Sequence, residues 1–182
     1  MSMATTTKQW TLEELHSLPD DGNKYELLRG ALFVTPPPNQ DHETIASRLT
    51  RVLEPYVTAN DLGLVYRPRA VFRFQGSEVE PDLMVRQPPR RNTEEWEDAP
   101  FPILIVEILS DSTRRRDRNQ KREFYVDAEI PEYWIVDPAQ RNITIVKPGE
   151  EDFVARDSLT WTPPGAAQPL TFPVASVFGT AT

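Results

Sequence analysis

The sequence predicts an α/β (α+β) fold: one domain with a mixed central β-sheet flanked by helices. Residues 101–109, FPILIVEIL, are apolar almost without interruption, which is typical of a strand covered on both faces. Residues 41–58 repeat apolar side chains at helical spacing, and SDST offers caps for a helix over 113–128. With 182 residues the chain can bury one substantial core, so a single domain over 1–182 is expected.

Two short elements are expected before the first long helix. Thr11 and Glu14 have the spacing of a capping box, which predicts a short helix through TLEELHSL. The segment KYELLRGALFVTPPP at 24–38 predicts a hairpin that turns at Arg29-Gly30 and stops at the prolines.

A second hairpin and a loop are expected between the long helix and the central strand. Asp41 is the expected N-cap of that helix. Residues 64–86 alternate apolar and polar side chains on either side of a QGS turn, so the return strand would carry Glu80 and Asp82. Residues 87–100 are polar and proline-rich and predict a loop.

The chain after residue 128 predicts two more strands. Pro131 ends the preceding helix, and EYWIVD at 132–137 and ITIVK at 143–147 have strand composition. The C-terminal third has a weaker pattern and is expected to pack around the edge of the sheet.

Composition restricts the chemistry. The chain has no cysteine, which excludes disulfides, thiolate catalysis and cysteine-bound metals, and its two histidines, His16 and His42, cannot make a three-histidine site. A metal held by side chains is therefore expected to be a hard, oxygen-liganded cation, Mg²⁺ or Mn²⁺. The motifs GxSxG, GxxxxGK[ST] and GxGxxG are absent, so serine hydrolase, P-loop and dinucleotide-binding functions are not expected.

The charge is unevenly distributed. A net charge of −8 and a pI near 4.9 argue against a general nucleic-acid binder. Residues 114–122, RRRDRNQKR, nevertheless hold six basic side chains and one acidic one, most simply a solvated helix face. No apolar run approaches the roughly 18 residues of a membrane span, and MSMATTTKQW does not resemble a signal sequence, so we expect a cytoplasmic protein with no membrane partner.

Two carboxylates are candidates for a metal site. Glu107 lies between Val106 and Ile108 in the most apolar strand, where an unpaired carboxylate would cost several kcal/mol of desolvation. It must therefore be protonated, ion-paired, hydrogen-bonded or bound to a metal. Asp82 belongs to a strand expected beside it, and a strand spacing of about 4.8 Å would let both carboxylates hold one cation.

Lys121 is expected at the same level as Glu107. The strand runs about 10 Å from Glu107 to Ser110, and the returning helix runs about 12 Å from Thr113 to Lys121. Its ammonium could orient an attacking water and stabilise charge on a phosphate. Asp117 and Tyr125 lie four residues to either side of Lys121, on the same helix face, and could belong to the site. Alternatively, Asp117 forms an ordinary ion pair with Lys121, and Tyr125 is a core residue.

The combination VEPDLMV, PILIVEILSDST, the Asp-Lys-Tyr spacing and EYWIVDP resembles a restriction endonuclease family long catalogued as a domain of unknown function, a branch of the PD-(D/E)xK nuclease superfamily. The likeness spans roughly 24–147 and implies a restriction-endonuclease-like fold. It implies that Asp82 and Glu107 hold the divalent metal and that Lys121 assists the attacking water. Glu26, in YELL, resembles a further acidic active-site residue, and His42 would line the same cleft.

The sequence departs from the superfamily pattern at one position. The superfamily lysine usually lies two residues after the glutamate, where this chain has Leu109. The resemblance therefore requires that the lysine has moved to the following helix, as Lys121.

The favoured interpretation is an Mg²⁺- or Mn²⁺-dependent endonuclease acting on DNA. Arg114, Arg115 and Arg118 are the candidate contacts to the DNA backbone, with Arg116 and Arg122 beside them, although one helix cannot turn all of them outward. Cutting both strands would favour a homodimer.

Two other functions remain open from the sequence. The chain could be a non-catalytic interaction or dimerisation module in which Glu107 and Lys121 form a buried ion pair. It could also be a glycosidase, with carboxylates as acid and nucleophile and Trp96, Trp134 or Trp161 as sugar platforms.

Overall fold

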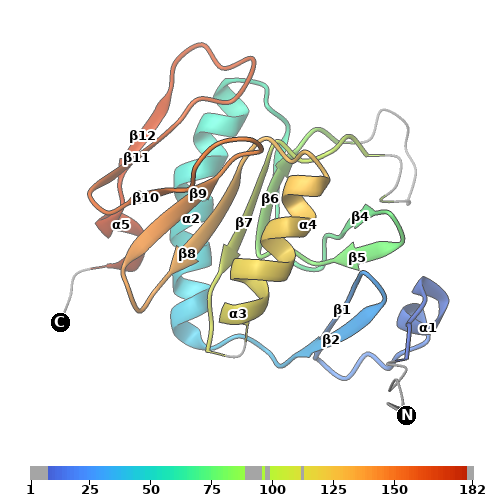
Figure 1. Cartoon of the computed structure of the whole chain (residues 1–182). Helices are drawn as coiled ribbons and strands as arrows, with labels where there is room; N and C mark the ends of the chain where they lie inside the picture. The colour runs from blue at the N-terminus through green and yellow to red at the C-terminus, as the bar shows by residue number, and fades with distance from the viewer. Residues whose placement is uncertain (1–7, 89–95, 97–98, 112, 180–182) are drawn as a thin grey trace.

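The chain forms a six-stranded mixed sheet in the order β10-β9-β8-β7-β6-β3 (Figure 1). A computed structural model describes residues 8–88, 96, 99–111 and 113–179. β7 and β8 run parallel, and the other neighbours run antiparallel. The strands are β3 (Leu64–Tyr66), β6 (Leu83–Arg86), β7 (Leu104–Ile108), β8 (Tyr133–Asp137), β9 (Asn142–Val146) and β10 (Phe153–Ala155). The predicted mixed sheet with the apolar run inside it is confirmed.

A smaller sheet has the order β2-β1-β5-β4, and a separate ribbon pairs β11 with β12. The hairpin predicted at 24–38 is present, with Arg29 and Gly30 at positive φ in its turn. The strands are β1 (Lys24–Leu28), β2 (Ala31–Thr35), β4 (Phe72–Phe74), β5 (Ser77–Val79), β11 (Ser158–Trp161) and β12 (Leu170–Pro173).

The second predicted hairpin is wrong in extent. Its two arms are divided between the sheets: β4 and β5 pair in the small sheet, whereas β3 and β6 pair in the large one. Glu80 and Asp82 therefore lie in the crossing segment between β5 and β6, not within a return strand. Pro68 and Pro81 fall in the two crossings, where a residue without a backbone N–H costs no ladder hydrogen bond.

Helices cover both faces of the large sheet, with α2 on one side and α3 and α4 on the other (Figure 1). The predicted helix at 113–128 is not uniformly α-helical, because its middle is a π-helical segment, Asp117–Lys121. Asn39, not Asp41, caps α2: its side chain accepts a hydrogen bond from the His42 N–H at 2.9 Å. The helices are α1 (Leu12–His16), α2 (Gln40–Ala59), α3 (Arg114–Arg116), α4 (Arg122–Asp127) and α5 (Ala175–Phe178).

The core has two parts, one on each face of the large sheet. Successive β7 side chains alternate between them: Val106 and Ile108 pack with α2, and Ile105 and Leu109 pack with α4. Glu107 therefore projects toward the α4 side. The capping box of α1 is present, and β10 lies at the sheet edge as predicted for the C-terminal third.

Two sequence-based predictions fall largely outside the described residues. They are the loop at 87–100, of which 89–95 and 97–98 are not described, and the segment MSMATTTKQW, of which 1–7 are not described. In the described part of the chain, no helix is both long and apolar enough to cross a membrane.

Candidate active site

A cavity of about 310 Å³ opens where the end of β7 meets β1, the start of α2 and helix α3. Several ionisable side chains from distant parts of the sequence line it. They include Lys24, His42, Glu80, Asp82, Glu107 and Arg116.

The sheet register brings Asp82 and Glu107 together. Leu83 pairs with Val106 across the antiparallel β6–β7 pair, so the preceding Asp82 lies beside Glu107. The Ile108 N–H donates a hydrogen bond to Asp82 Oδ2 at 2.8 Å, which ties the aspartate to the neighbouring strand. The two carboxylates lie on one side of the sheet and face the same cavity.

Glu107 is held by two donors on the helix that covers it. Its Oε1 accepts from Lys121 Nζ at 2.6 Å and from the Tyr125 hydroxyl at 2.8 Å. Burial raises the pKa of Glu107, and although Lys121 opposes this shift, the result is a pKa of about 7. When no cation is bound, this carboxyl therefore gives up its proton less readily than an ordinary glutamate.

Lys121 bridges two buried carboxylates. Its Nζ donates to Glu26 Oε1 at 2.8 Å as well as to Glu107, and its side chain is fully buried. Burial raises the pKa of Glu26, but Lys121, Lys24 and Arg116 outweigh it and lower the value to about 2. Lys121 ends the π-helical segment, a wider turn often found at functional sites.

Arg116 and Asp117 complete the buried side of this network. Arg116 Nη2 lies 3.2 Å from Glu26 Oε2, and its Nη1 donates to the Thr35 hydroxyl at 3.1 Å. Asp117 Oδ1 lies 3.9 Å from Lys121 Nζ, the i,i+4 ion pair considered from the sequence. Tyr125 donates to Glu107 and is also the core tyrosine considered from the sequence, because its ring packs 4.8 Å from the Tyr133 ring.

Asp82 has a different set of partners. Lys24 Nζ lies 3.4 Å from Asp82 Oδ1 and donates to the Glu80 carbonyl at 3.1 Å. His42 Nε2 lies 3.0 Å from Asp82 Oδ2. Burial lowers the pKa of His42, but the hydrogen bond and charge of Asp82 outweigh it and raise the value. Burial raises the pKa of Asp82, yet Lys24 and His42 hold it well below its usual range.

Lys24 was not singled out from the sequence. A signal was present, because it begins strand β1 two residues before Glu26 and therefore shares a face with it. Glu80 was noted only as a strand residue. The structure places its carboxyl at the cavity, where burial raises its pKa.

The donor set fits a hard divalent cation only in part. Among the described residues, no group of three or more His, Cys, Asp or Glu side chains is arranged to hold a metal. Asp82 and Glu107 supply two carboxylates, and both hydrogen bonds to Glu107 go to Oε1. Mg²⁺ and Mn²⁺ tolerate so few protein ligands because water and substrate oxygens complete their shells. The pair is compatible with such a cation.

Comparisons with known proteins give the family and the fold of this chain. The chain matches the Uma2 family, described as "Putative restriction endonuclease", over residues 12–175. The chain belongs to the Uma2 family. A protein from Anabaena variabilis described as a putative nuclease has a similar solved structure, with 20% identity, a TM-score of 0.78, and coverage of 93% of this chain and 97% of that one. This likeness shows the fold. No curated protein matches the chain in sequence.

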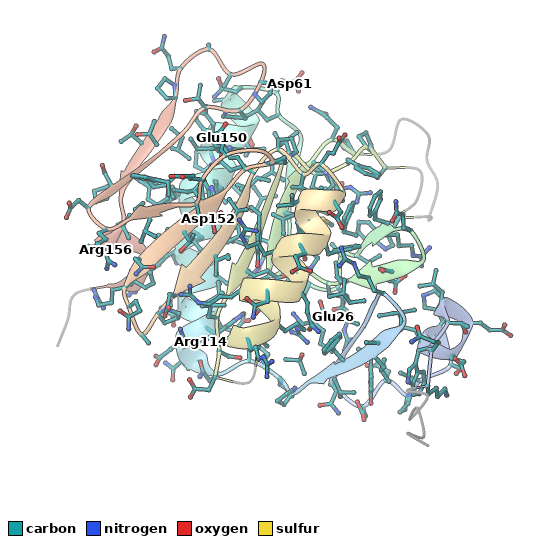
Figure 2. All side chains as sticks on the ribbon, in the orientation of Figure 1. Glu26, Asp61, Arg114, Glu150, Asp152 and Arg156 are labelled. Carbon is teal, nitrogen blue, oxygen red and sulfur yellow. The ribbon has the colours of Figure 1, made fainter. Side chains whose placement is uncertain are left out.

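In this Uma2 chain the basic segment is not a uniform solvated face. Arg114 Nη1 and Arg118 Nη2 both donate to Asp137 Oδ2 at 2.6 Å, and Asp137 is fully buried. Arg116 turns inward, whereas Arg115 is exposed. Figure 2 shows Arg114 at the lower end of the helix formed by α3 and α4, and Glu26 between this helix and the β1–β2 hairpin. Arg122 pairs with Asp152 through two hydrogen bonds.

The three tryptophans considered as sugar platforms, Trp96, Trp134 and Trp161, do not lie at the cavity. Trp134 and Trp161 are buried in the core, and their rings pack 5.8 Å apart. Trp96 packs against Tyr66 at 5.7 Å. None of the three lines the cavity that contains the carboxylates, which removes the main support for the glycosidase interpretation.

Proposed function

We propose that this protein is an Mg²⁺- or Mn²⁺-dependent nuclease that hydrolyses DNA phosphodiester bonds. The observation that carries the proposal is the meeting of Asp82 and Glu107 at one cavity, with Lys121 bonded to Glu107. Membership of the Uma2 family supports a nuclease activity. In this proposal Asp82 and Glu107 hold the cation.

The reaction needs few groups from the chain. The oxygen of a water forms a bond to phosphorus while that water loses a proton to solvent, one P–O ester bond breaks, and the departing oxygen takes up a proton. A divalent cation bound here would polarise a phosphoryl oxygen and lower the pKa of the attacking water. The role of Lys121 and Tyr125 is to fix the Glu107 carboxyl, while Glu26 keeps Lys121 charged and in place.

The proposed partner is DNA, and the proposed assembly is a homodimer. Arg115 is exposed, and Arg114 and Arg118 are partly exposed beside it, so they remain candidate contacts to backbone phosphates. Each copy carries one candidate site, so cutting both strands at one place would take two copies related by a two-fold axis.

The experiment compares wild type with Glu107→Gln on linear, nicked and single-stranded DNA, with Mn²⁺, Mg²⁺ or EDTA. Glutamine keeps the size of the side chain and removes its charge. We expect metal-dependent cleavage by wild type and none by the variant, whose folding is checked by thermal unfolding. Cleavage by Glu107→Gln at the wild-type rate would reject the site.

A second candidate is a non-catalytic module in which this network only stabilises the fold. The fully buried pair between Lys121 and Glu107, 2.6 Å apart, favours it, since such a pair needs no metal. Titration with Mn²⁺ separates the two functions. A nuclease should gain thermal stability with Mn²⁺ beyond that seen in matched NaCl, whereas a module should not.

A further inference from the structure

The two lysines of the site differ in what they can reach. Lys121 is fully buried, does not line the cavity, and bridges Glu26 and Glu107. A phosphate could contact its ammonium only after one of these bonds opened. Lys24 lines the cavity, and its side chain is 18% exposed.

We propose that Lys24 is the catalytic residue that donates a hydrogen bond to the phosphate being cleaved, and that Lys121 is a positioning residue that acts through Glu107. This inference rests on the proposed nuclease function. It differs from the role that the family resemblance implies for Lys121.

The hydrogen bonds of Lys24 leave it able to bind an anion. An ammonium has three N–H donors. Within the described part of the chain, the partners of Lys24 Nζ are the Glu80 carbonyl at 3.1 Å and Asp82 Oδ1 at 3.4 Å. The second distance is long for a charged pair, so this bond yields readily to a closer acceptor. One of its three donors therefore has no partner among the described residues, and Lys24 lines the cavity.

The other permanently charged basic residues that line the cavity are less suitable for binding the phosphate. Arg116 is held by Glu26, Asp117 and Thr35. Arg69 pairs with the exposed Asp20 at 3.2 Å. Lys24 alone, among the described lysines and arginines, both lines the cavity and contacts a carboxylate proposed to hold the cation. A phosphate that contacts that cation would therefore lie near the Lys24 ammonium.

The chemical role of Lys24 is electrostatic. Negative charge redistributes over the phosphoryl oxygens as water attacks phosphorus and the ester bond breaks, and a fixed ammonium stabilises that charge. Lys24 gives up no proton in this step. Its contribution should therefore appear in turnover and in binding of the phosphate backbone.

The test uses Lys24→Met and Lys24→Gln, which remove the charge, and Lys24→Arg, which keeps it. Lys147→Met is the matched control, because Lys147 pairs with Glu132, away from these carboxylates. Four quantities are measured on the full chain: kcat and KM on DNA with saturating Mn²⁺, affinity for a short single-stranded oligonucleotide with Ca²⁺ by fluorescence anisotropy, and Mn²⁺ affinity by calorimetry.

We expect the neutral Lys24 variants to lose about 10²-fold in kcat and about tenfold in oligonucleotide affinity. Their Mn²⁺ affinity should be unchanged or higher, because an ammonium no longer competes at Asp82. Lys24→Arg should recover oligonucleotide affinity, and Lys147→Met should match wild type. Lys121→Met, in contrast, should weaken Mn²⁺ binding.

Two results would overturn the inference. One is a kcat for both neutral variants within threefold of wild type together with unchanged oligonucleotide affinity. The other is a loss of Mn²⁺ affinity that accounts for the lost turnover, since Lys24 would then only support Asp82. If wild type cleaves no DNA, the proposed function fails, and the Lys24 assignment is judged on oligonucleotide affinity alone, where equal values reject it.

Discussion

The inner and outer halves of the site differ in how closely their charged side chains are paired and in how exposed they are. The inner half is Lys121 between Glu26 and Glu107, with donor–acceptor distances of 2.8 and 2.6 Å, respectively, and a lysine side chain 0% exposed. The outer half is Asp82 between Lys24 and His42, at 3.4 and 3.0 Å, beside a cavity. Both contain carboxylates and ammonium groups within about one strand spacing of each other.

This difference separates side chains that fix the geometry of the site from side chains that can contact ligands. A fully buried charge must be matched by short bonds to fixed partners, so the inner half cannot exchange them without a large desolvation cost. The outer half has longer bonds and access to water, so its groups can change partners when a cation or phosphate arrives. We therefore assign support of Glu107 to the inner half and contact with ligands to the outer half.

The largest effect is expected for Lys121→Met. It would leave Glu26 and Glu107 buried without their shared cation, and we expect a loss of about 3–5 kcal/mol in the free energy of unfolding. Lys24→Met should cost distinctly less, because Asp82 keeps His42 and the Ile108 N–H. Urea unfolding of both variants measures the difference, and equal losses would break the distinction between the halves.

The next effect is a pH dependence of Glu107 in the metal-free protein. Its folded pKa, about 7, is above its usual value, so between pH 4.5 and 7 the folded state holds a proton that the unfolded chain has lost. Stability from this group therefore falls as pH rises through that window and is constant above it, by up to about 1.4 kcal/mol per pH unit.

Glu107→Gln provides the reference for that measurement, since it cannot titrate. The unfolding free energy of the variant minus that of wild type should rise from pH 4.5 to about 7 and then level off. A difference that does not change with pH would mean that Lys121 keeps Glu107 ionised throughout.

A smaller effect is expected for His42→Gln. The folded pKa of His42 is raised by Asp82, so its stabilisation is fully present at low pH and declines as pH rises through that folded value. We expect a loss of about 1 kcal/mol at pH 6 and a smaller loss at pH 9. Chemical unfolding at the two pH values tests it, and a larger loss at pH 9 would contradict the assignment.

The smallest effect concerns the arginines outside both halves. Arg115→Ala should lower the slope of log affinity against log salt for DNA by about 0.9, with little change in folding. Arg114→Ala should change the slope less, because this guanidinium already pairs with Asp137. Anisotropy titrations at several salt concentrations measure both slopes, and a larger change for Arg114→Ala would reverse the order.

Parts of the site followed from local sequence patterns. The unbroken apolar run around Glu107 required an interior strand, and a carboxylate there required a partner. Fixed rises per residue in strands and helices then placed Lys121 level with it, which the 2.6 Å contact matches. The π-helical segment did not move Lys121 out of reach of Glu107, although the estimate assumed a regular α-helix.

Other parts did not follow from any local pattern. The alternation through 64–86 predicted one hairpin, whereas β5 and β6 belong to different sheets. Period-2 alternation reports which face a residue occupies, but not which strand lies beside it. The roles of Arg114, Arg116 and Arg118 were equally hidden, because Asp137 and Glu26 come from distant strands.

The sequence by itself determined the long helix α2, the central strand β7 and the need to neutralise Glu107, since burial and periodicity are properties of nearby residues. Only the tertiary structure decided that Lys121 would be sealed between two glutamates and that Lys24 would reach the cavity. The physical reason is that exposure and electrostatic partners depend on how the two sheets pack around the helix, and this packing brings together residues as far apart in the chain as Lys24 and Asp82.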